Sequence, residues 1–301
     1  MPSPVNAPKR LLVTGGRGRL ASLIADQFRA PAHDITLFSR TGGEGFQPLE
    51  KLPAALSGAG SLLHLAWSTL PATSEKGGGL EWKSDLPPLE KLLQSIAALP
   101  DPQRPYFVFF SSGGTVYGNA PGRANIESDP CLPIGWYGRA KLAAEQMIET
   151  YVTRHGLACA VLRISNPYGY PVPKNRVQGI IPHAIRCAVE DQPLSLWGDG
   201  SARKDFLYYT DFLSAIEAVI QRRLTGTFNL SAHASHTVRE VIGLVEKNTG
   251  RAINLIHQPA PFWDVRDSQL DNQRFIAATG WRPLVSLDEG IRRATAGYAT
   301  H

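Results

Sequence analysis

A tyrosine and a lysine four residues apart, Tyr137 and Lys141, are the residues of this sequence whose types and spacing best suit proton transfer. On a helix, side chains at this spacing lie one above the other on the same face. A nearby lysine ammonium favours the tyrosinate and lowers the pKa of the tyrosine. Such a tyrosine can remove the proton of a hydroxyl while a hydride leaves the carbon. The pair alone also fits a partly buried tyrosine beside a solvated lysine.

A glycine-rich segment near the N-terminus suits phosphate binding. Gly16, Gly18 and Ala21 match the pattern G-x-G-x-x-G/A, between a predicted strand at 11–13 and a predicted helix at 20–28. Glycines let the backbone approach a pyrophosphate, and a helix N-terminus presents N–H groups to the anion. The motif alone also fits an ordinary βα turn. Its place between a strand and a helix predicts dinucleotide binding.

Strands and helices alternate up to about residue 168, which predicts an α/β fold with a doubly wound parallel sheet. The ligand of such a sheet binds at the carboxyl ends of its strands. We expect a dinucleotide-binding domain at 1–168, with 205–231 packing back on it, and a smaller mixed α/β substrate domain from 169–204 and 232–301. The strands expected are 11–13, 34–38, 61–66, 106–110, 158–164, 194–197, 226–230 and 254–257. The helices expected are 20–28, 52–56, 81–99 with a kink at Pro87-Pro88, 137–155, 181–190, 211–221, 238–249 and 286–296, and 71–79 is expected to be a mobile loop.

Composition excludes several classes of protein. The sequence has no run of about 18 apolar residues, so we expect no membrane span. Residues 1–9 lack the apolar core of a secretion signal. The three cysteines are odd in number and lack metal-ligand spacing, so we expect reduced thiols, a cytoplasmic location and no metal. The net charge is +5, and the basic residues are scattered along the chain without a run of Lys or Arg, which argues against nucleic acid as a partner.

Taken in order, the motifs resemble those of the extended short-chain dehydrogenase/reductases, and among them the NAD-dependent epimerase/dehydratase family that acts on nucleotide sugars. The segments that carry this resemblance are Thr14–Ala21, His64–Ala66, Ser111–Gly118, Tyr137–Lys141, Leu162–Gly169, Gly198–Gly200, Lys204–Tyr208, Phe228–Leu230 and Gly280–Pro283. The resemblance implies a Rossmann fold in which Tyr137 and Lys141 are the catalytic pair and Lys141 also holds the nicotinamide ribose. Packing is a reasonable alternative explanation for His64, Tyr117 and Tyr168.

The resemblance also implies which residues surround the ligands. The cofactor-binding residues expected are Gly15, Gly16, Arg17, Gly18, Arg19, Leu20, Ser39, Arg40, Leu65, Ala66, Trp67, Ser111, Ser112, Tyr137, Lys141 and Ile164. The substrate-binding residues expected are Thr115, Tyr137, Asn166, Arg203, Lys204 and Arg266.

The sequence departs from the family pattern where the substrate is expected. Gly113 stands where the family usually has the Ser or Thr that hydrogen-bonds the substrate oxygen, so either Ser112 or Thr115, with Thr115 slightly favoured, is expected to replace it in catalysis. Gly114 and Thr115 stand where dehydratases carry Asp and Glu, which argues against 4,6-dehydration. A basic residue that usually contacts the diphosphate appears as Lys204, and a second, expected near 261, is Pro261 here. Arg266 is the nearest replacement.

The expected cofactor follows from the end of the second predicted strand. NAD-binding folds usually place an acidic residue there to bind the ribose 2′-hydroxyl. This chain has Ser39 and Arg40 instead, and Arg17 in the glycine loop can approach from the other side. An arginine can pair with a 2′-phosphate, so NADP is favoured over NAD, although NAD can bind without a ribose carboxylate.

The reaction expected is 4-epimerisation of a nucleotide hexose through a 4-keto intermediate. The alternative is an NADP-dependent 4-keto-sugar reductase, and a non-catalytic nucleotide-binding sensor is less favoured. The family further suggests a homodimer through the helices at about 81–99 and 137–154. Its face would be lined by Leu89, Leu92, Leu93, Met147 and Ile148, unless these residues only cover the sheet.

Overall fold

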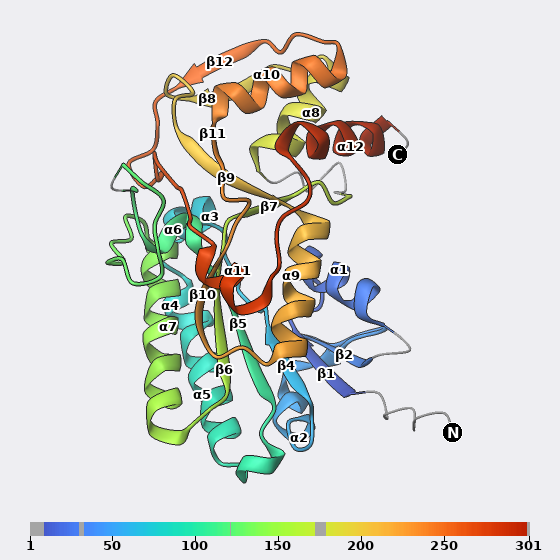
Figure 1. Cartoon of the computed structure of the whole chain (residues 1–301), viewed down its shortest axis with the longest axis vertical. Helices are drawn as coiled ribbons and strands as arrows, with labels where there is room; N and C mark the ends of the chain where they lie inside the picture. Colours follow the sequence, from blue (N-terminus) through green and yellow to red (C-terminus); the bar gives the residue numbers. More distant parts are fainter. Residues whose placement is uncertain (1–8, 30–32, 121, 172–178, 300–301) are drawn as a thin grey trace. The chain divides into compact units, whose positions relative to one another are not determined.

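The computed structural model describes residues 9–29, 33–120, 122–171 and 179–299 of the 301-residue chain (Figure 1). Residues 1–8, which bear on the expected absence of a secretion signal, lie outside them. The chain forms two compact units, the first made of residues up to Ser111, Ala140–Leu162 and Val219–Thr227, and the second of the remaining segments. The expected division at residue 168 leaves 112–139 in the first domain, whereas the contacts group this segment with the second unit.

The expected α/β fold is confirmed by a seven-stranded parallel sheet in the order β10-β6-β5-β4-β1-β2-β3. Its strands are β1 (Lys9–Thr14), β2 (His33–Ser39), β3 (Gln47–Pro48), β4 (Ser61–His64), β5 (Tyr106–Ser112), β6 (Cys159–Ile164) and β10 (Gly226–Leu230). β1 pairs in parallel with β2 and with β4, which places Thr14 beside Phe38 and His64. Leu11, Leu12 and Val13 of β1 are all buried. A strand covered on both faces requires such a continuous apolar run.

Helices cover the sheet of the first unit. Its helices are α1 (Arg19–Phe28), α2 (Leu52–Ala55), α3 (Pro71–Lys76), α4 (Glu81–Ser84), α5 (Leu86–Ala97) and most of α7 (Trp136–His155), with short 3-10 turns at Leu49–Lys51 and Asp101–Gln103. Figure 1 shows α5 and α7 on one side of the sheet and α1 on the other. None of the helices in the described part of the chain is long and apolar enough to cross a membrane.

The apolar residues expected to line a dimer face belong instead to the core of the first unit. Leu89, Leu92, Leu93 and Ile148 are buried and pack with the side chains of the sheet, and Met147 is partly buried against the same cluster. That lining is therefore wrong, because an amphipathic pattern does not say which apolar surface covers a helix. The homodimer itself stays a prediction, which light scattering at micromolar concentration tests.

Residues 71–79 were expected to be a loop, whereas the structure forms helix α3 over Pro71–Lys76. Helix α3 begins with Pro71, whose missing N–H costs nothing in the first turn. The carboxylate of Glu81 is fully buried and accepts hydrogen bonds from the hydroxyls of Thr69, at 3.1 Å, and of Ser74. The helix expected at 81–99 is two helices, α4 and α5, which meet at Asp85. The two prolines thus lie in the first turn of α5 rather than at a kink.

The second unit has two small sheets and its own core. A three-stranded sheet joins β7 (Asn166–Tyr168), β9 (Arg203–Tyr208) and β11 (Ser235–Thr237), and β8 (Leu194–Trp197) pairs with β12 (Leu255–Gln258). Its helices are α6 (Gly113–Val116), α8 (Ile180–Glu190), most of α9 (Tyr209–Arg222), α10 (Val238–Thr249), α11 (Gln273–Thr279) and α12 (Leu287–Ala299). The side chains of Thr237 and Glu240 cap α10 reciprocally, and Gly250 ends it in the left-handed conformation. α6, α11 and β7, β9 and β11 were not expected from the sequence.

Candidate functional site

The glycine loop forms a tight turn between β1 and α1. Gly15 has a φ of +72°, and the N–H of Gly18 donates to the Gly15 carbonyl at 2.7 Å. A Cβ on Gly15 would lie 2.9 Å from the backbone N of Ala66, so only glycine fits there. No side chain caps the N-terminus of α1, whose first turn holds Arg19 and Leu20. A turn of this kind presents backbone N–H groups to an anion, so the loop fits the pyrophosphate of a dinucleotide.

The end of β2 carries Ser39 and Arg40 where an acidic residue would bind the ribose of NAD. The Ser39 side chain is buried, and its Oγ has no hydrogen-bond partner among the described residues. Arg40 is exposed. Arg17 reaches the loop that follows: its Nη2 donates to the Gly42 carbonyl at 2.5 Å, and its guanidinium lies 4.8 Å from the centre of the Phe46 ring. Two arginines therefore stand at a strand end that has no carboxylate.

The end of β4 is fixed by a buried pair of polar side chains. Thr14 Oγ1 lies 3.0 Å from His64 Nδ1 and accepts the N–H of Ala66 at 3.2 Å. Burial, together with the nearby Lys141 charge, lowers the pKa of His64 to about 3, so this imidazole is neutral. His64 therefore has a structural role: it holds in place the backbone that continues through Leu65 and Ala66 against the glycine loop.

Lys141 is buried in the first unit, with 4% of its surface exposed. Its Nζ donates to the carbonyl of Phe110 on β5 at 2.9 Å. Burial lowers the pKa of Lys141 to about 7, although the carboxylates of Asp85, Glu145 and Glu81 act in the opposite direction. Near neutral pH, Lys141 can therefore be present both as the ammonium and as the neutral amine.

Tyr137 lies one turn before Lys141 on α7 and is half-buried. The neighbouring Gly138 explains how this turn is placed. A Cβ on Gly138 would lie 2.7 Å from the Thr115 carbonyl and 2.9 Å from the Cβ of Pro133. Because Gly138 has no side chain, the first turn of α7 packs directly on α6 and brings Tyr137 close to the residues that follow β5.

The space beside Gly113 is filled by an apolar side chain. A Cβ on Gly113 would overlap Cδ1 of Leu270 and lie 3.0 Å from the Arg163 carbonyl. A serine hydroxyl at this position therefore has no room without movement of Leu270. Of the two hydroxyls expected to replace it, that of Thr115 makes a long 3.4 Å bond to the Ser112 carbonyl of its own turn. Both residues are half-buried.

A third hydroxyl, that of Ser268, was not expected from the sequence. Ser268 is 2% exposed, and its Oγ has no hydrogen-bond partner among the described residues. It lies 3.7 Å from the point where a Gly114 side chain would begin, and the amide atoms of Asn166 lie 3.9 and 4.0 Å from the same point. The Asn166 amide N–H donates to the Asp205 carbonyl at 2.8 Å, which fixes the side chain. An unpaired buried hydroxyl carries no sequence signal, because the segments involved are far apart in the chain.

The basic residues expected to bind the substrate differ in how many of their hydrogen bonds and ion pairs are made within the protein. Lys204 Nζ is paired with Asp264 at 2.8 Å and is only 18% exposed. Arg203 donates to the Oγ of Ser235 at 3.1 Å and to its carbonyl at 2.6 Å. Arg266 is exposed, and its guanidinium makes no hydrogen bond or ion pair with the residues that the structure describes. Lys204 is therefore engaged within the protein, whereas the Arg266 side chain is exposed.

The remaining expected cofactor residues lie at the carboxyl ends of β5 and β6. Ser111 is buried and its hydroxyl donates to Glu145 on α7, so this hydroxyl is engaged within the protein. Ile164 is buried as the last residue of β6. Within the described residues, no group of three or more His, Cys, Asp or Glu side chains is arranged to hold a metal ion.

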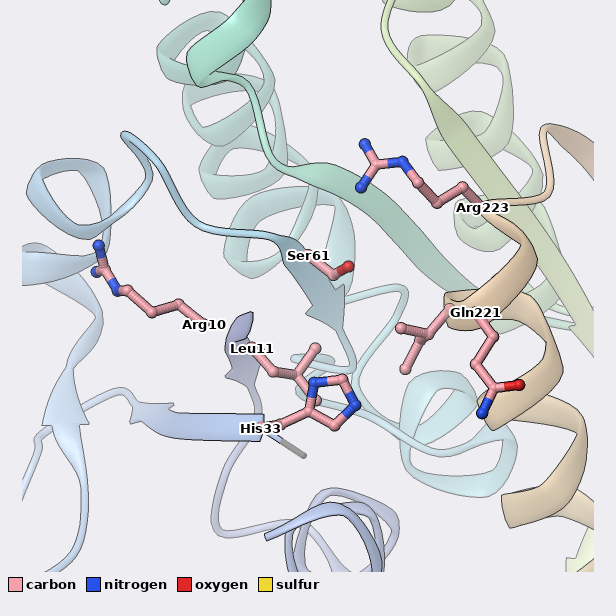
Figure 2. A pocket seen from close by; sticks show the side chains of 7 residues that line it. Arg10, Leu11, His33, Ser61, Gln221 and Arg223 are labelled. Atoms are coloured by element: carbon pink, nitrogen blue, oxygen red, sulfur yellow. The ribbon is translucent and has the colours of Figure 1, made fainter. Parts of the chain in front are cut away.

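A small hollow lies at the opposite, amino-terminal edge of the strands (Figure 2). Arg10, His33 and Ser61 line it, together with Arg223. The arginines donate to backbone carbonyls, Arg10 to that of Ala55 at 3.1 Å and Arg223 to that of Gly60 at 3.1 Å. Figure 2 shows the Arg10 guanidinium pointing away from the hollow. Because both arginines donate to backbone carbonyls, the hollow is a poor candidate for the site of chemistry.

Comparison with known proteins decides the family. The model of the NAD dependent epimerase/dehydratase family matches residues 11–231. The chain belongs to this family. It is thus an NAD(P)-dependent enzyme of the extended short-chain dehydrogenase/reductase type, as its motifs imply.

Relatives of this epimerase/dehydratase chain catalyse several reactions. It is 27% identical, over its whole length and 99% of the relative's, to dTDP-6-deoxy-L-talose 4-dehydrogenase (NAD(P)(+)) of Kitasatospora kifunensis. It is 30% identical to dTDP-4-dehydro-6-deoxyglucose reductase of Escherichia coli, over 61% of this chain and 58% of the relative's length. The structure of the UDP-glucose 4-epimerase of Thermus thermophilus in complex with NAD is similar, with 26% identity, a TM-score of 0.85 and coverage of 96% of this chain and 99% of that one.

Proposed function

We propose that this chain is an NADP(H)-linked oxidoreductase that acts at C4 of a nucleotide-activated hexose, and that its reaction is the reduction of a 4-keto sugar. The observation that carries this proposal is the end of β2, where Ser39, Arg40 and Arg17 replace an acidic residue. A 2′-phosphate finds arginines there and no carboxylate to repel it. The full-length similarity to a 4-dehydrogenase described as using NAD(P)(+) supports the same reaction.

The proposal gives each of the expected residues a role. The glycine loop and the start of α1 would hold the pyrophosphate, and Lys141 the nicotinamide ribose. NADPH, when bound, supplies the hydride that C4 receives. Tyr137 gives its phenolic proton to O4 of the sugar, so that the C=O bond becomes CH–OH, and the tyrosinate recovers its proton from solvent. The Lys141 ammonium, one turn along α7, stabilises that tyrosinate. Arg266 would neutralise the diphosphate of the substrate.

Dehydration at C5 and C6 is not part of the proposal. That reaction needs an acid and a base beside the sugar, and the two positions hold Gly114 and Thr115. Neither side chain can take up a proton at neutral pH.

Epimerisation at C4 is the second candidate, because the similarity to a UDP-glucose 4-epimerase extends over 96% of the chain. It uses the same residues and differs in the fate of the cofactor. An epimerase returns the hydride to the sugar it came from, whereas a reductase releases oxidised cofactor.

Labelled cofactor separates the two reactions. The enzyme is mixed with NADPH deuterated on its reactive carbon and a panel of 4-keto nucleotide sugars, and the products are examined by mass spectrometry. Reduction transfers one deuterium to each product molecule and consumes NADPH in equal amount. Inversion of a 4-hydroxy nucleotide sugar without net consumption of cofactor would replace the proposal with epimerisation. Tight cofactor binding without any turnover would instead indicate the sensor.

A further inference from the structure

The ammonium of Lys141 is held between an aromatic face and a carbonyl. Its Nζ lies 3.7 Å from the centre of a Trp67 ring, and it donates to the Phe110 carbonyl at 2.9 Å. The Phe109 ring lies farther away, at 4.9 Å. All four residues belong to the first unit. An aromatic face within about 6 Å attracts a cation, most strongly when the cation is removed from water as Lys141 is.

The Trp67 ring is fixed by its surroundings. The Phe109 ring packs against it edge to face, with 6.2 Å between ring centres and an interplanar angle of 68°. The backbone is anchored on both sides of Trp67, because the N–H of Ala66 donates to Thr14 and the N–H of Ser68 donates to Asp85 at 3.0 Å. An indole held in this way presents its face to Lys141 without having to be ordered first.

We propose that Trp67 is a positioning residue for the reaction: its indole face holds the Lys141 ammonium against the Phe110 carbonyl, next to Tyr137 on α7. This inference rests on the role proposed above for Lys141. Trp67 touches the lysine and acts through it, so it is distinct from the residues that meet the substrate. A leucine would still cover part of the lysine with an apolar side chain and would not attract its charge.

The charged groups around Lys141 come from four elements. Asp85 at the start of α5, Glu81 on α4 and Glu145 on α7 favour the ammonium, whereas His64 on β4 is neutral. Burial works against the charge and brings the pKa of Lys141 to about 7. Since Lys141 acts as the ammonium, its contribution is present below this pKa and lost as the pH rises through it. Loss of the indole face removes one favourable contribution and moves that loss to lower pH.

The test is the pH dependence of NADP⁺ affinity, measured by calorimetry between pH 5.5 and 9. The wild type is compared with Trp67→Phe, which keeps an aromatic face, Trp67→Leu, which keeps an apolar side chain without a ring, and Lys141→Gln. We expect affinity to fall around neutral pH in the wild type and Lys141→Gln to abolish this fall. Trp67→Leu should move the fall to lower pH by about one unit, and Trp67→Phe by less than half as much.

A substitution that keeps the shape of the indole guards against misfolding. Fluorotryptophans with increasing fluorine content, introduced at position 67, weaken the negative face of the ring step by step, and the fall should move to lower pH in the same order. Equal profiles for the fluorinated series, or equal shifts for Trp67→Phe and Trp67→Leu, would overturn the inference about Trp67 alone. A Lys141→Gln variant that keeps the wild-type fall would instead remove the proposed role of Lys141.

Discussion

Arg40 offers a direct test of the proposed cofactor. Its guanidinium is exposed at the end of β2, so the interaction with a 2′-phosphate takes place close to bulk water. A phosphate monoester carries a charge of about −1.5 to −2 at neutral pH. At roughly 4 Å in water this charge attracts one guanidinium by about 1.5–2 kcal/mol. Arg40→Ala should therefore weaken NADP⁺ binding by about 10–30-fold.

The binding of NAD⁺ supplies the contrast in the same experiment. NAD⁺ lacks the 2′-phosphate, so calorimetry should show its affinity for Arg40→Ala within about twofold of the wild-type value, because an exposed surface substitution costs little elsewhere. Arg17→Ala should weaken both cofactors, since Arg17 also bonds Gly42 and packs on Phe46. Arg29→Ala, an exposed arginine just after α1, is the matched control and should change neither affinity.

Ionic strength gives a further check on the electrostatic reasoning. Screening acts over about 8 Å at physiological salt and about 3 Å at 1 M. The difference between wild type and Arg40→Ala in NADP⁺ affinity should therefore shrink as salt is added. Tighter binding of NAD⁺ than of NADP⁺ by the wild type, or an equal loss for both cofactors in Arg40→Ala, would refute the assignment.

Three other expectations concern single side chains. Tyr137→Phe should lower kcat by about 10²–10⁴-fold with cofactor affinity near normal, and activity within about threefold of wild type would exclude proton transfer by Tyr137. If a protein hydroxyl replaces the one missing at Gly113, then one of Thr115→Val, Ser112→Ala and Ser268→Ala should lower kcat strongly in steady-state assays. Full activity in all three variants would mean that only Tyr137 or water hydrogen-bonds the substrate oxygen. Burial raises the pKa of Asp205 to about 7, above its unfolded value, so its ionisation opposes folding from about pH 4 upward. Thermal unfolding should accordingly show the stability of Asp205→Asn rising relative to that of the wild type between pH 5 and pH 8, by about 2–3 kcal/mol, and a constant difference across this range would contradict the raised pKa of Asp205.

The parts of the fold that the sequence predicts are those with a regular apolar pattern. The buried run Leu11–Val13 and the long helix around Tyr137 and Lys141 are where the pattern puts them. The segment at 71–79 has no such pattern, and its order comes from Glu81, a single buried carboxylate that accepts two hydroxyls. A composition rich in Gly, Ser and Thr predicts a loop because it does not show that a nearby carboxylate is buried and accepts these hydroxyls.

The candidate site divides in the same way. Gly15 could be assigned from the sequence because its neighbours lie in one motif, and the structure adds the reason, its approach to Ala66. The filling of the space at Gly113 by Leu270, and the unpaired hydroxyl of Ser268, depend on segments more than 150 residues apart. The engagement of Lys204 with Asp264 is likewise a tertiary contact, which the motif around Lys204 does not reveal.

The contact between Gly113 and Leu270 limits how this enzyme can change by mutation. A serine introduced at Gly113 overlaps Leu270. Trimming Leu270 first opens a cavity, which for a buried leucine costs about 2–5 kcal/mol. Gly113→Ser therefore requires Leu270 to move, and a smaller residue at 270 would leave room for the new hydroxyl. The two positions are therefore coupled, so the cost of Gly113→Ser and Leu270→Ala made together should be smaller than the sum of their separate costs.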